Sequence, residues 1–487
     1  MAGIGVKLNN IYNKNTLTTN ITGMAYSTII TIAPMIAIIA ALMLMQKVLD
    51  FSTIDYATRE LFSCTIMYIF IFSLLTVSPL NSVLSRYMSD VIYEERYQDI
   101  QPCYMIGMII TAILAACLGI PFCIKEVVVG HVPVFYVFTG YCGYIMLTVV
   151  FYSMIYLSIC KDYVKISLFF LSGMVCTFVL SFVLVFIFHV EKTFAMLVSF
   201  DVGFVIIAAL ELSVIKSYFR ENSGEYRAVL HYLRKYYKLI ITNFMYTLGI
   251  YVHNFVFWTT DLRIEVVKCF VCVTSYDMAT CLAMFTNITT SVIFLSRVEM
   301  HFHERYKAYS EAVIGGRHMD IEITKKRMFR QLSEELMSLV RIQFIISVIL
   351  FFMAIIFLPK FGFGGMVMQI YPCLAAGYFI MFIMYSSIIF LYYFNDLNGG
   401  LLTAGTFCIV TLIVSVFATK LPIIWYGIGL VAGAMAGWCV AYRRLRWLEV
   451  NLDSHIFCNG NIINCRRKRK PKTMVFNRNK KGRRARK

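Results

Sequence analysis

The chain has 487 residues, of which 59% are hydrophobic and 15% are charged, and its mean hydropathy is +0.72. Globular chains carry about 25% charged residues, so a soluble protein could not hide this much apolar surface. The composition therefore excludes a soluble enzyme or binding module and indicates a polytopic membrane protein. We expect no cleavable signal peptide, because the first apolar run is too long and lacks a small-residue cleavage site.

The net charge of +18 is unevenly placed. From Arg466 to the end of the chain there are 13 Lys or Arg and no acid, so the rest of the chain carries only +5. We interpret this tail as a basic arm that binds anionic lipid or a partner. Because the excess charge is confined to the arm, we expect no nucleic acid among the partners of the protein.

Apolar stretches of about 20 residues, the length that a helix needs to cross a bilayer, recur along the whole chain. We predict twelve spans, centred near Pro34, Phe72, Leu114, Met146, Leu180, Phe204, Gly249, Thr286, Leu350, Ile383, Ile409 and Leu430. The predicted fold class is an all-α polytopic membrane protein, with these helices in two pseudo-symmetric six-helix lobes. The expected segments are an N-terminal interfacial segment (1–20), an N-terminal lobe (21–216), a cytoplasmic inter-lobe linker (217–237), a C-terminal lobe (238–445) and a basic tail (446–487).

Lys and Arg favour the cytoplasmic side of a membrane protein, so their distribution predicts its orientation. If the N-terminus lies inside, the inner segments hold 37 of the 45 Lys and Arg residues and the outer loops hold 8. Without the last inner segment the ratio is still 21 to 8, so we expect both termini in the cytoplasm. The long inner loop 297–341 is predicted to contain a surface helix that rests on anionic lipid or on a partner through Ile321, Met328 and Leu332.

One uncharged stretch carries a polar face. Nineteen residues separate Asp277 from Arg297, and within them Thr280, Asn287 and Ser291 share one side of a helix. Lipid would make that face costly, so it should look into protein or a wet cavity. After Arg297 the helix is expected to continue into water, with an apolar edge of Phe302, Tyr306 and Tyr309.

Ionisable groups inside spans are costly unless they are paired or hydrated. Asp201 has either a transport or coupling role or a structural hydrogen bond, whereas Glu211 is nearer the inner face and could snorkel to water. His253 and Asn254 form either a packed polar pair or part of a path. The predicted substrate path comprises Asp201, Thr280, Asn287, Ser291, His253 and Asn254. The candidate hinges, or static kinks, are the prolines within the spans, Pro34 and Pro79.

No motif of an enzyme or of a bound cofactor occurs in the sequence. There is no Gly-Lys pair for a P-loop, no Asp-x-Asp pair for a metal-dependent sugar transferase and no His-Glu-x-x-His for a zinc protease. We therefore expect no catalytic residue, no cofactor and no metal, and the spacing of His455, Cys458 and Cys465 is poor for a metal site. Cys269-x-x-Cys272 allows a disulfide, although a plain buried pair is the favoured interpretation.

Several motifs resemble those of a known family. They are Ser78-Pro79-Leu80 followed by Ser85-Arg86-Tyr87 and Asp90, Tyr246-x-Leu248-Gly249-Ile250 followed by Phe257-Trp258, Tyr276-Asp277-Met278-Ala279 through Arg297-Val298-Glu299, and Tyr392-Tyr393-Phe394-Asn395-Asp396. Over about Met1–Phe457 the chain resembles the Pel exopolysaccharide exporter (PelG) family of bacterial biofilm systems, in the multidrug/oligosaccharidyl-lipid/polysaccharide (MOP) flippase superfamily. It departs from the usual pattern at His253-Asn254, where an acidic–basic pair is expected, and at Ala33-Pro34-Met35, where Gly-Pro-Trp is usual.

The resemblance implies that an amino-sugar polymer passes across the bacterial cytoplasmic membrane through a cavity between the lobes. It also implies a cytosolic glycosyltransferase and small membrane proteins as partners in a synthase complex. Three alternatives stay open. The first is a drug or lipid-linked oligosaccharide flippase of the same superfamily. The second is a membrane glycosyltransferase or polymerase, for which no extramembrane segment is long enough to form a catalytic domain. The third is a membrane component of a synthase complex without transport of its own.

The predicted orientation can be tested by labelling introduced cysteines with an impermeant reagent in intact cells. A cysteine in the 216–238 linker or at the C-terminus should be shielded, and one placed near Asp261 should react, because the charge distribution puts only the latter outside. The unmodified chain, with its fifteen native cysteines, sets the background. Labelling of the linker and C-terminal positions would overturn the two-lobe interpretation.

Overall fold

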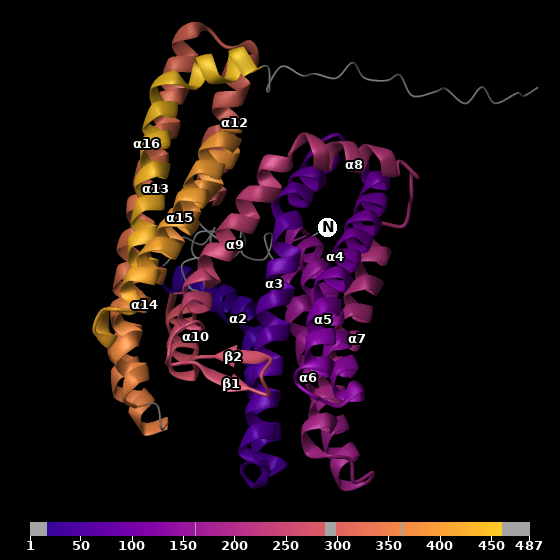
Figure 1. Ribbon diagram of the computed structural model, residues 1–487. Helices are drawn as coiled ribbons and strands as arrows, with labels where there is room; N and C mark the ends of the chain where they lie inside the picture. The colour runs from indigo at the N-terminus through magenta and orange to yellow at the C-terminus, as the bar shows by residue number, and fades with distance from the viewer. Residues whose placement is uncertain (1–16, 161, 288–298, 362–363, 460–487) are drawn as a thin grey trace, which may run out of the picture. The chain divides into compact units, whose positions relative to one another are not determined.

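The computed structural model describes residues 17–160, 162–287, 299–361 and 364–459. Within these ranges the chain is almost wholly helical (Figure 1). The helices are α2 (Leu17–Val48), α3 (Tyr56–Tyr93), α4 (Ile100–Val128), α5 (Val134–Ile159), α6 (Tyr163–Phe186), α7 (Lys192–Tyr218), α8 (Tyr226–Lys235), α9 (Tyr237–Phe257), α10 (Thr274–Asn287), α12 (Glu299–Gly315), α13 (His318–Phe357), α14 (Met366–Tyr393), α15 (Leu397–Ala418) and α16 (Ile428–Asn459). Short 3-10 turns lie at Phe51–Thr53, Tyr97–Asp99, Leu358–Phe361 and Ile423–Trp425.

Ten helices in these ranges are long and apolar enough to cross a membrane. They correspond to ten of the twelve predicted spans, and the all-α membrane class is confirmed. The first predicted span falls in α2, of which Ala33–Val48 forms a shorter apolar helix. The eighth begins as α10 and passes after Asn287 into residues outside the description.

Many hydroxyl side chains inside the apolar helices bond to the backbone of their own helix. Thr111 donates to the carbonyl of Gly107 at 2.7 Å, and Thr148 donates to the carbonyl of Tyr144 at 2.6 Å. Each bond returns to the helix's own backbone one turn earlier, which removes the cost of a bare hydroxyl in an apolar medium. The Ser and Thr content of the spans is therefore compatible with membrane burial.

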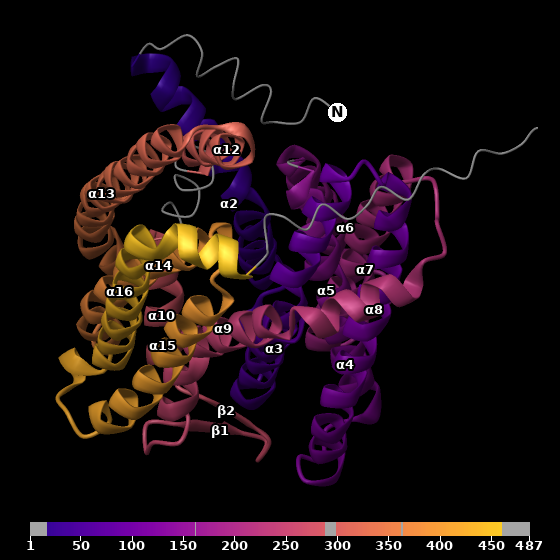
Figure 2. The same ribbon diagram turned by 90° about the horizontal axis from the view of Figure 1, so that it is seen from above.

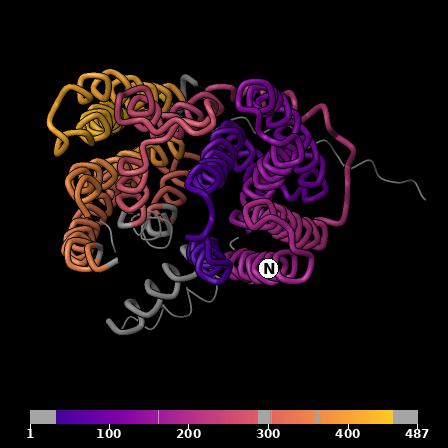
Figure 3. Tube along the Cα trace, turned by 60° about the horizontal axis from the view of Figure 1, so that its bottom comes forward, coloured from indigo at the N-terminus to yellow at the C-terminus, as the bar shows by residue number. Residues whose placement is uncertain are grey.

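The helices gather into two bundles. In the N-terminal bundle, α2 packs on α6, α6 on α7, and α5 on α3, α4 and α7; Figure 3 shows these helices together, indigo to magenta. In the C-terminal bundle, α9 packs on α15, α10 on α14, and α13 on α12 and α14. Helix α3 also packs along α9 and so joins the two bundles, as Figure 2 shows from above.

Helix α8 connects the bundles in sequence and is fixed to the end of α3. Tyr232 of α8 donates to the Asp90 carboxylate at 2.6 Å, and its ring meets Tyr87 edge-on at 5.0 Å. Burial, and then the bond to Asp90, raise the pKa of Tyr232, so the phenol remains a donor. Arg86 lies over the ring of Tyr236 at 4.5 Å. The Arg86-Tyr87 motif thus holds the connector in place.

A two-stranded hairpin between α9 and α10 was not expected from the sequence. Strand β1 (Ile264–Val266) pairs antiparallel with β2 (Phe270–Cys272), with Ile264 opposite Cys272. Val267 and Lys268 turn the chain with φ values of 52° and 57°. The strands are only three residues long. Segments this short show no clear hydrophobic period, so the sequence pattern does not predict them.

The loop 297–341 contains the predicted helix, but the expectation that Met328 and Leu332 lie on its surface, against anionic lipid or a partner, is wrong. Helix α13 runs without interruption from this loop into the ninth span, and Met328 and Leu332 are buried within the protein. Phe329 stacks on Phe394 at 5.3 Å. Protein contacts, rather than lipid, therefore cover the apolar face. The preceding helix α12 agrees with its prediction, because Phe302 is buried as part of an apolar edge.

The chain divides into two compact units, Met1–Tyr442 and Arg443–Lys487. The described part of the second unit continues α16, where Arg446 pairs with Glu449 at 2.6 Å and Arg444 lies over the ring of Trp447 at 4.3 Å. The predicted interfacial segment at the N-terminus, before Leu17, and the basic tail after Asn459 lie outside the described residues. Their roles stay predictions.

Helices α6 and α7 cross so closely that only glycine fits. A Cβ on Gly173 would lie 2.4 Å from the Ile207 side chain and 3.0 Å from the Gly203 carbonyl. We predict that Gly173→Ala lowers the stability of the purified protein by about 1–3 kcal/mol, because overpacking forces the helices apart. Thermal unfolding measures the effect. Gly405→Ala is the matched control, since a Cβ there meets nothing within 4 Å; equal midpoints for the two variants would contradict the prediction.

Candidate functional site

The carboxylate of Asp277 is the centre of a hydrogen-bond network at one end of α9. It accepts the Asn254 amide at 2.7 Å, the Trp258 indole N–H at 3.1 Å and the backbone N–H of Val273 at 3.0 Å. The Asn254 amide also donates to Thr280 at 3.3 Å. Hydrogen bonds to a charged group contribute about 1.5–3 kcal/mol each. The network therefore fixes the first turn of α10 against the end of α9.

The same end of the molecule holds the two bundles together through Tyr68 of α3. Its ring stacks on Trp258 at 5.2 Å with an interplanar angle of 5°. Its hydroxyl donates to the carbonyl of Val271 at 2.9 Å and accepts the N–H of the same residue at 3.1 Å. Phe72, one turn further along α3, stacks on Phe255. Aromatic and backbone contacts thus join α3 to both α9 and the hairpin.

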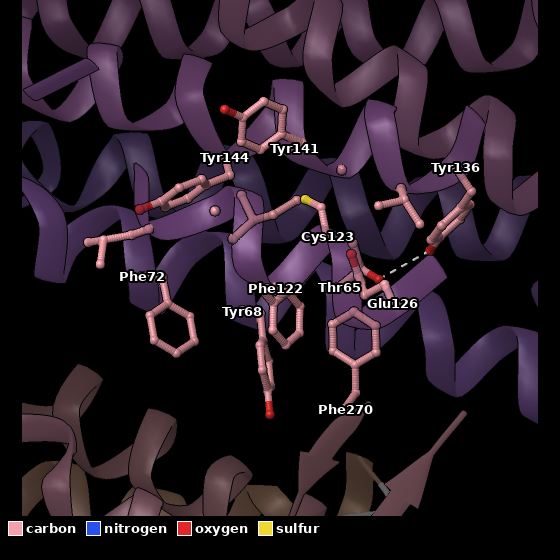
Figure 4. A pocket seen from close by; sticks show the side chains of 15 residues that line it. Thr65, Tyr68, Phe72, Phe122, Cys123, Glu126, Tyr136, Tyr141, Tyr144 and Phe270 are labelled. Atoms are coloured by element: carbon pink, nitrogen blue, oxygen red, sulfur yellow. Dashed lines mark hydrogen bonds between the residues drawn. The ribbon is translucent and has the colours of Figure 1, made fainter. Parts of the chain in front are cut away.

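A cavity of about 240 Å³ lies beside this junction, walled by α3, α4, α5 and the hairpin (Figure 4). Its aromatic walls come from Tyr68, Phe72, Phe122, Tyr136, Tyr141 and Tyr144, with Phe270 of β2 closing one side. Ligand pockets commonly measure about 300–1,000 Å³. The cavity is therefore suited to a small group, such as one ring of a larger molecule, rather than to a long segment.

Glu126 is the one acidic residue in the wall of this cavity. Figure 4 shows its carboxylate beside Tyr136 and Phe270. The residue is only 6% exposed, and its side chain has no hydrogen-bond partner among the residues that the structure describes. The nearby Tyr136 hydroxyl donates instead to Thr65 at 3.3 Å. A buried carboxylate that faces an aromatic cavity can attract a cationic group whose ring stacks on the walls.

The predicted path residues fall into two places. His253 bonds to the Tyr276 hydroxyl at 2.8 Å, and Asn254 and Thr280 belong to the Asp277 network. Asp201 lies instead on α7, against Gly143 of α5. The side chain of Asn287, and Ser291 and Arg297, lie outside the described residues, as does the side chain of Glu299. His253 and Asn254 thus bond to Tyr276 and to Asp277, respectively, and the path itself stays a prediction.

Helix α7 carries two carboxylates, of which Asp201 is half-buried and Glu211 is buried. Oδ1 of Asp201 has no hydrogen-bond partner within the described ranges, and a Cβ on Gly143 would lie 2.4 Å from it. Glu211 is fully buried, and neither carboxylate oxygen has a hydrogen-bond partner in the part of the chain described. The interpretation that Glu211 snorkels to water is therefore wrong, because neighbouring helices enclose it.

The remaining motif residues have structural positions. Asp396 begins α15, where its carboxylate accepts the N–H of Gly399 at 3.1 Å. Ser85 is half-buried on α3, next to the residues that hold α8. Pro79 lies within α3, and Pro34 lies within α2; whether either is a hinge stays a prediction.

Glu126 was missed by the sequence analysis. It stands with Lys125 at the end of an apolar run, where a charged pair is ordinarily read as the edge of a span. The signal that could have identified it is the apolar Val127-Val128-Val129 that follows. This run shows that the helix continues past the charge.

Solved structures with a similar fold are membrane transporters. A MOP superfamily transporter from Pyrococcus furiosus has 12% sequence identity and a TM-score of 0.61, with 88% of this chain and 96% of that chain covered. The Vibrio cholerae MATE transporter VcmN in its bent form has 13% identity and a TM-score of 0.57, with 90% and 98% covered. At this identity the likeness shows the fold alone, which is that of MATE-like MOP transporters. None of the curated protein sequences matches the chain.

The chain thus has the fold of MOP transporters, with ten helices among the described residues that are long and apolar enough to cross a membrane. A model of the PelG family, described as an exopolysaccharide exporter (EPS-E), matches residues 1–457. The chain belongs to this PelG family. Family and fold together point to a membrane transporter or flippase with a polysaccharide substrate, rather than to an enzyme.

The Asp277 network predicts a large loss of stability on removal of its acceptor. Asp277→Ala leaves the Trp258 indole N–H buried without its acceptor and leaves the Asn254 amide with only its 3.3 Å bond to Thr280, and we expect a loss of about 3–5 kcal/mol. Thermal unfolding of the purified protein measures it. Asp261→Ala, an exposed acid in the adjacent loop, should unfold like the unmodified chain. An Asp277→Ala variant with unchanged stability would show that the network has no structural role.

Proposed function

We propose that this protein exports an amino-sugar exopolysaccharide of the Pel type across the bacterial cytoplasmic membrane, for a biofilm matrix. The observation that carries the proposal is the family match over residues 1–457, combined with a cavity that has aromatic walls and one buried carboxylate. Aromatic faces suit the apolar faces of sugar rings. The Glu126 carboxylate would draw the ammonium group of a deacetylated amino sugar.

The proposed route for the polymer lies between the two bundles. Asp201 supplies a second carboxylate in the N-terminal bundle, half-buried and with Oδ1 unpaired among the described residues. Thr280 supplies a hydroxyl on α10, and Asn287 and Ser291 are proposed to extend the polar face further along the chain. A hydroxyl-rich substrate would find donors and acceptors along such a route, whereas lipid would not.

The orientation and partners follow from the same proposal. Both termini face the cytoplasm, where the basic tail binds anionic lipid and a cytosolic glycosyltransferase supplies the growing polymer. Small membrane proteins complete the synthase complex. The water-exposed part of α13, with Lys325, Lys326 and Arg327 in sequence, lies on the cytoplasmic side in this orientation.

A flippase for lipophilic cations is the second candidate. The cavity walls are mainly apolar and aromatic with a single carboxylate, a combination that also suits an organic cation. Cells that express the protein should then extrude a cationic dye and become resistant to it. Polymer secretion without dye efflux favours the exporter, and dye efflux without polymer secretion favours the second candidate.

The carboxylates predict a specific loss of transport. Glu126→Gln keeps the shape of the side chain and removes the charge, so secreted polymer should fall about tenfold, the effect of losing about 1.4 kcal/mol of attraction. Membrane level and thermal unfolding should stay normal. Asp201→Asn, assayed in parallel, tests the route separately from the cavity.

Glu265→Gln is the matched control, because Glu265 is an exposed residue of β1 and should export normally. Normal secretion from Glu126→Gln would remove the cavity from the proposed function. Normal secretion from Asp201→Asn would remove Asp201 from the route. Loss of expression in both variants would assign these carboxylates a structural role.

A further inference from the structure

Two cysteines from distant parts of the sequence face each other at the junction of the bundles. Cys64 of α3 and Cys272 of β2 are 208 residues apart in the chain, and their sulfur atoms are 3.3 Å apart. Both side chains are almost fully buried. The sulfur atoms need to approach by only about 1.3 Å to reach the disulfide bond length of about 2.05 Å.

The contact is held in register by neighbouring residues. Tyr68 follows Cys64 by one turn of α3, and Val271 precedes Cys272 on β2; Tyr68 and Val271 exchange two hydrogen bonds of 2.9 and 3.1 Å. These two hydrogen bonds fix α3 against β2 next to the two thiols, which therefore lie opposite each other. The Cys64 thiol donates toward Cys272, and this hydrogen bond lowers the pKa of Cys272.

The third cysteine in the area points elsewhere. Cys269 lies at the turn of the hairpin, where its thiol contacts the carbonyl of Lys125 at 3.4 Å. A bond between Cys269 and Cys272 would have to disturb the hairpin, whose strands pair up to Cys272. The Cys-x-x-Cys spacing that is visible in the sequence is therefore a poorer candidate than the contact that only the fold creates.

We propose that Cys64 and Cys272 form a disulfide that joins α3 of the N-terminal bundle to the hairpin of the C-terminal bundle. Helix α9 spans the membrane between α8 at one end and the hairpin at the other. In the proposed orientation, α8 is cytoplasmic and the hairpin faces the outside. Extracytoplasmic compartments of bacteria are oxidising, which allows disulfides to persist there.

The oxidant is a protein disulfide of the exported thiol–disulfide exchange class. The Cys272 thiolate attacks this disulfide, releases one oxidant thiolate and forms a mixed disulfide. The Cys64 thiolate then attacks the Cys272 sulfur of the mixed disulfide and releases the second oxidant thiolate. Two cysteine thiols and one oxidant disulfide thus give one Cys64–Cys272 disulfide and two oxidant thiols. The exchange takes place before α3 and the hairpin close on each other, because afterwards both sulfur atoms are buried.

Cys64 precedes the connector α8 in the sequence and Cys272 follows it, so cleavage next to α8 places the two cysteines on separate fragments. Gly224 lies between α7 and α8 with a φ of 71°, and a Cβ added there would meet nothing within 4 Å, so a protease site can be inserted there. Membranes are treated with N-ethylmaleimide to block exchange, the protein is cleaved, and the two fragments are run on a denaturing gel without reductant. The fragments should stay joined and should separate on reduction.

Matched variants identify the bond. Cys269→Ser should leave the fragments joined, whereas Cys64→Ser or Cys272→Ser should let them separate. Peptide mapping of the unmodified protein by mass spectrometry, which needs no variant to fold, should find the Cys64 and Cys272 peptides linked. Fragments of the unmodified protein that separate without reductant would overturn the proposal, and so would a linkage that maps to another pair. The readout is independent of polymer export, so failure of the proposed function would leave it intact.

Discussion

The hydrogen bonds that converge on Asp277 set the arrangement of the chain around α9. They fix α10 to α9 and orient Trp258, and Trp258 in turn stacks on Tyr68 of the other bundle. Tyr68 then secures the hairpin through the backbone of Val271. One buried carboxylate thus supports a chain of contacts across both bundles, and the cavity beside Phe270 exists because this junction is closed.

The fold class could be predicted from the sequence because it depends on summed hydrophobicity, which needs no knowledge of contacts. The apolar edge of α12 was predictable from periodicity, because Phe302, Tyr306 and Tyr309 lie at helical spacing. The burial of Met328 was not, since periodicity shows that a face is apolar but cannot show whether lipid or Phe394 and its neighbours cover it. The pairing of Cys64 with Cys272 needs the full topology.

The candidate site divides in the same way. Asp201 could be identified from the sequence as an ionisable residue within a span, because its position there needs only a count of residues. Glu126 escaped notice because its burial comes from packing of α4 against α5 and the hairpin. The MATE-like fold is shared with structures at 12–13% identity, so the chemistry of this chain rests on such individual side chains and not on the scaffold.

Helix α13 has 40 residues, which at about 1.5 Å per residue gives a length of about 60 Å. A hydrocarbon core is about 30 Å thick, so roughly half of the helix stands clear of the bilayer as a continuous rod. The packing of α12 and Phe394 along its length stiffens the projecting half. A force that rotates the projecting end of α13 would therefore also rotate the half inside the bilayer, because the helix is continuous between the two.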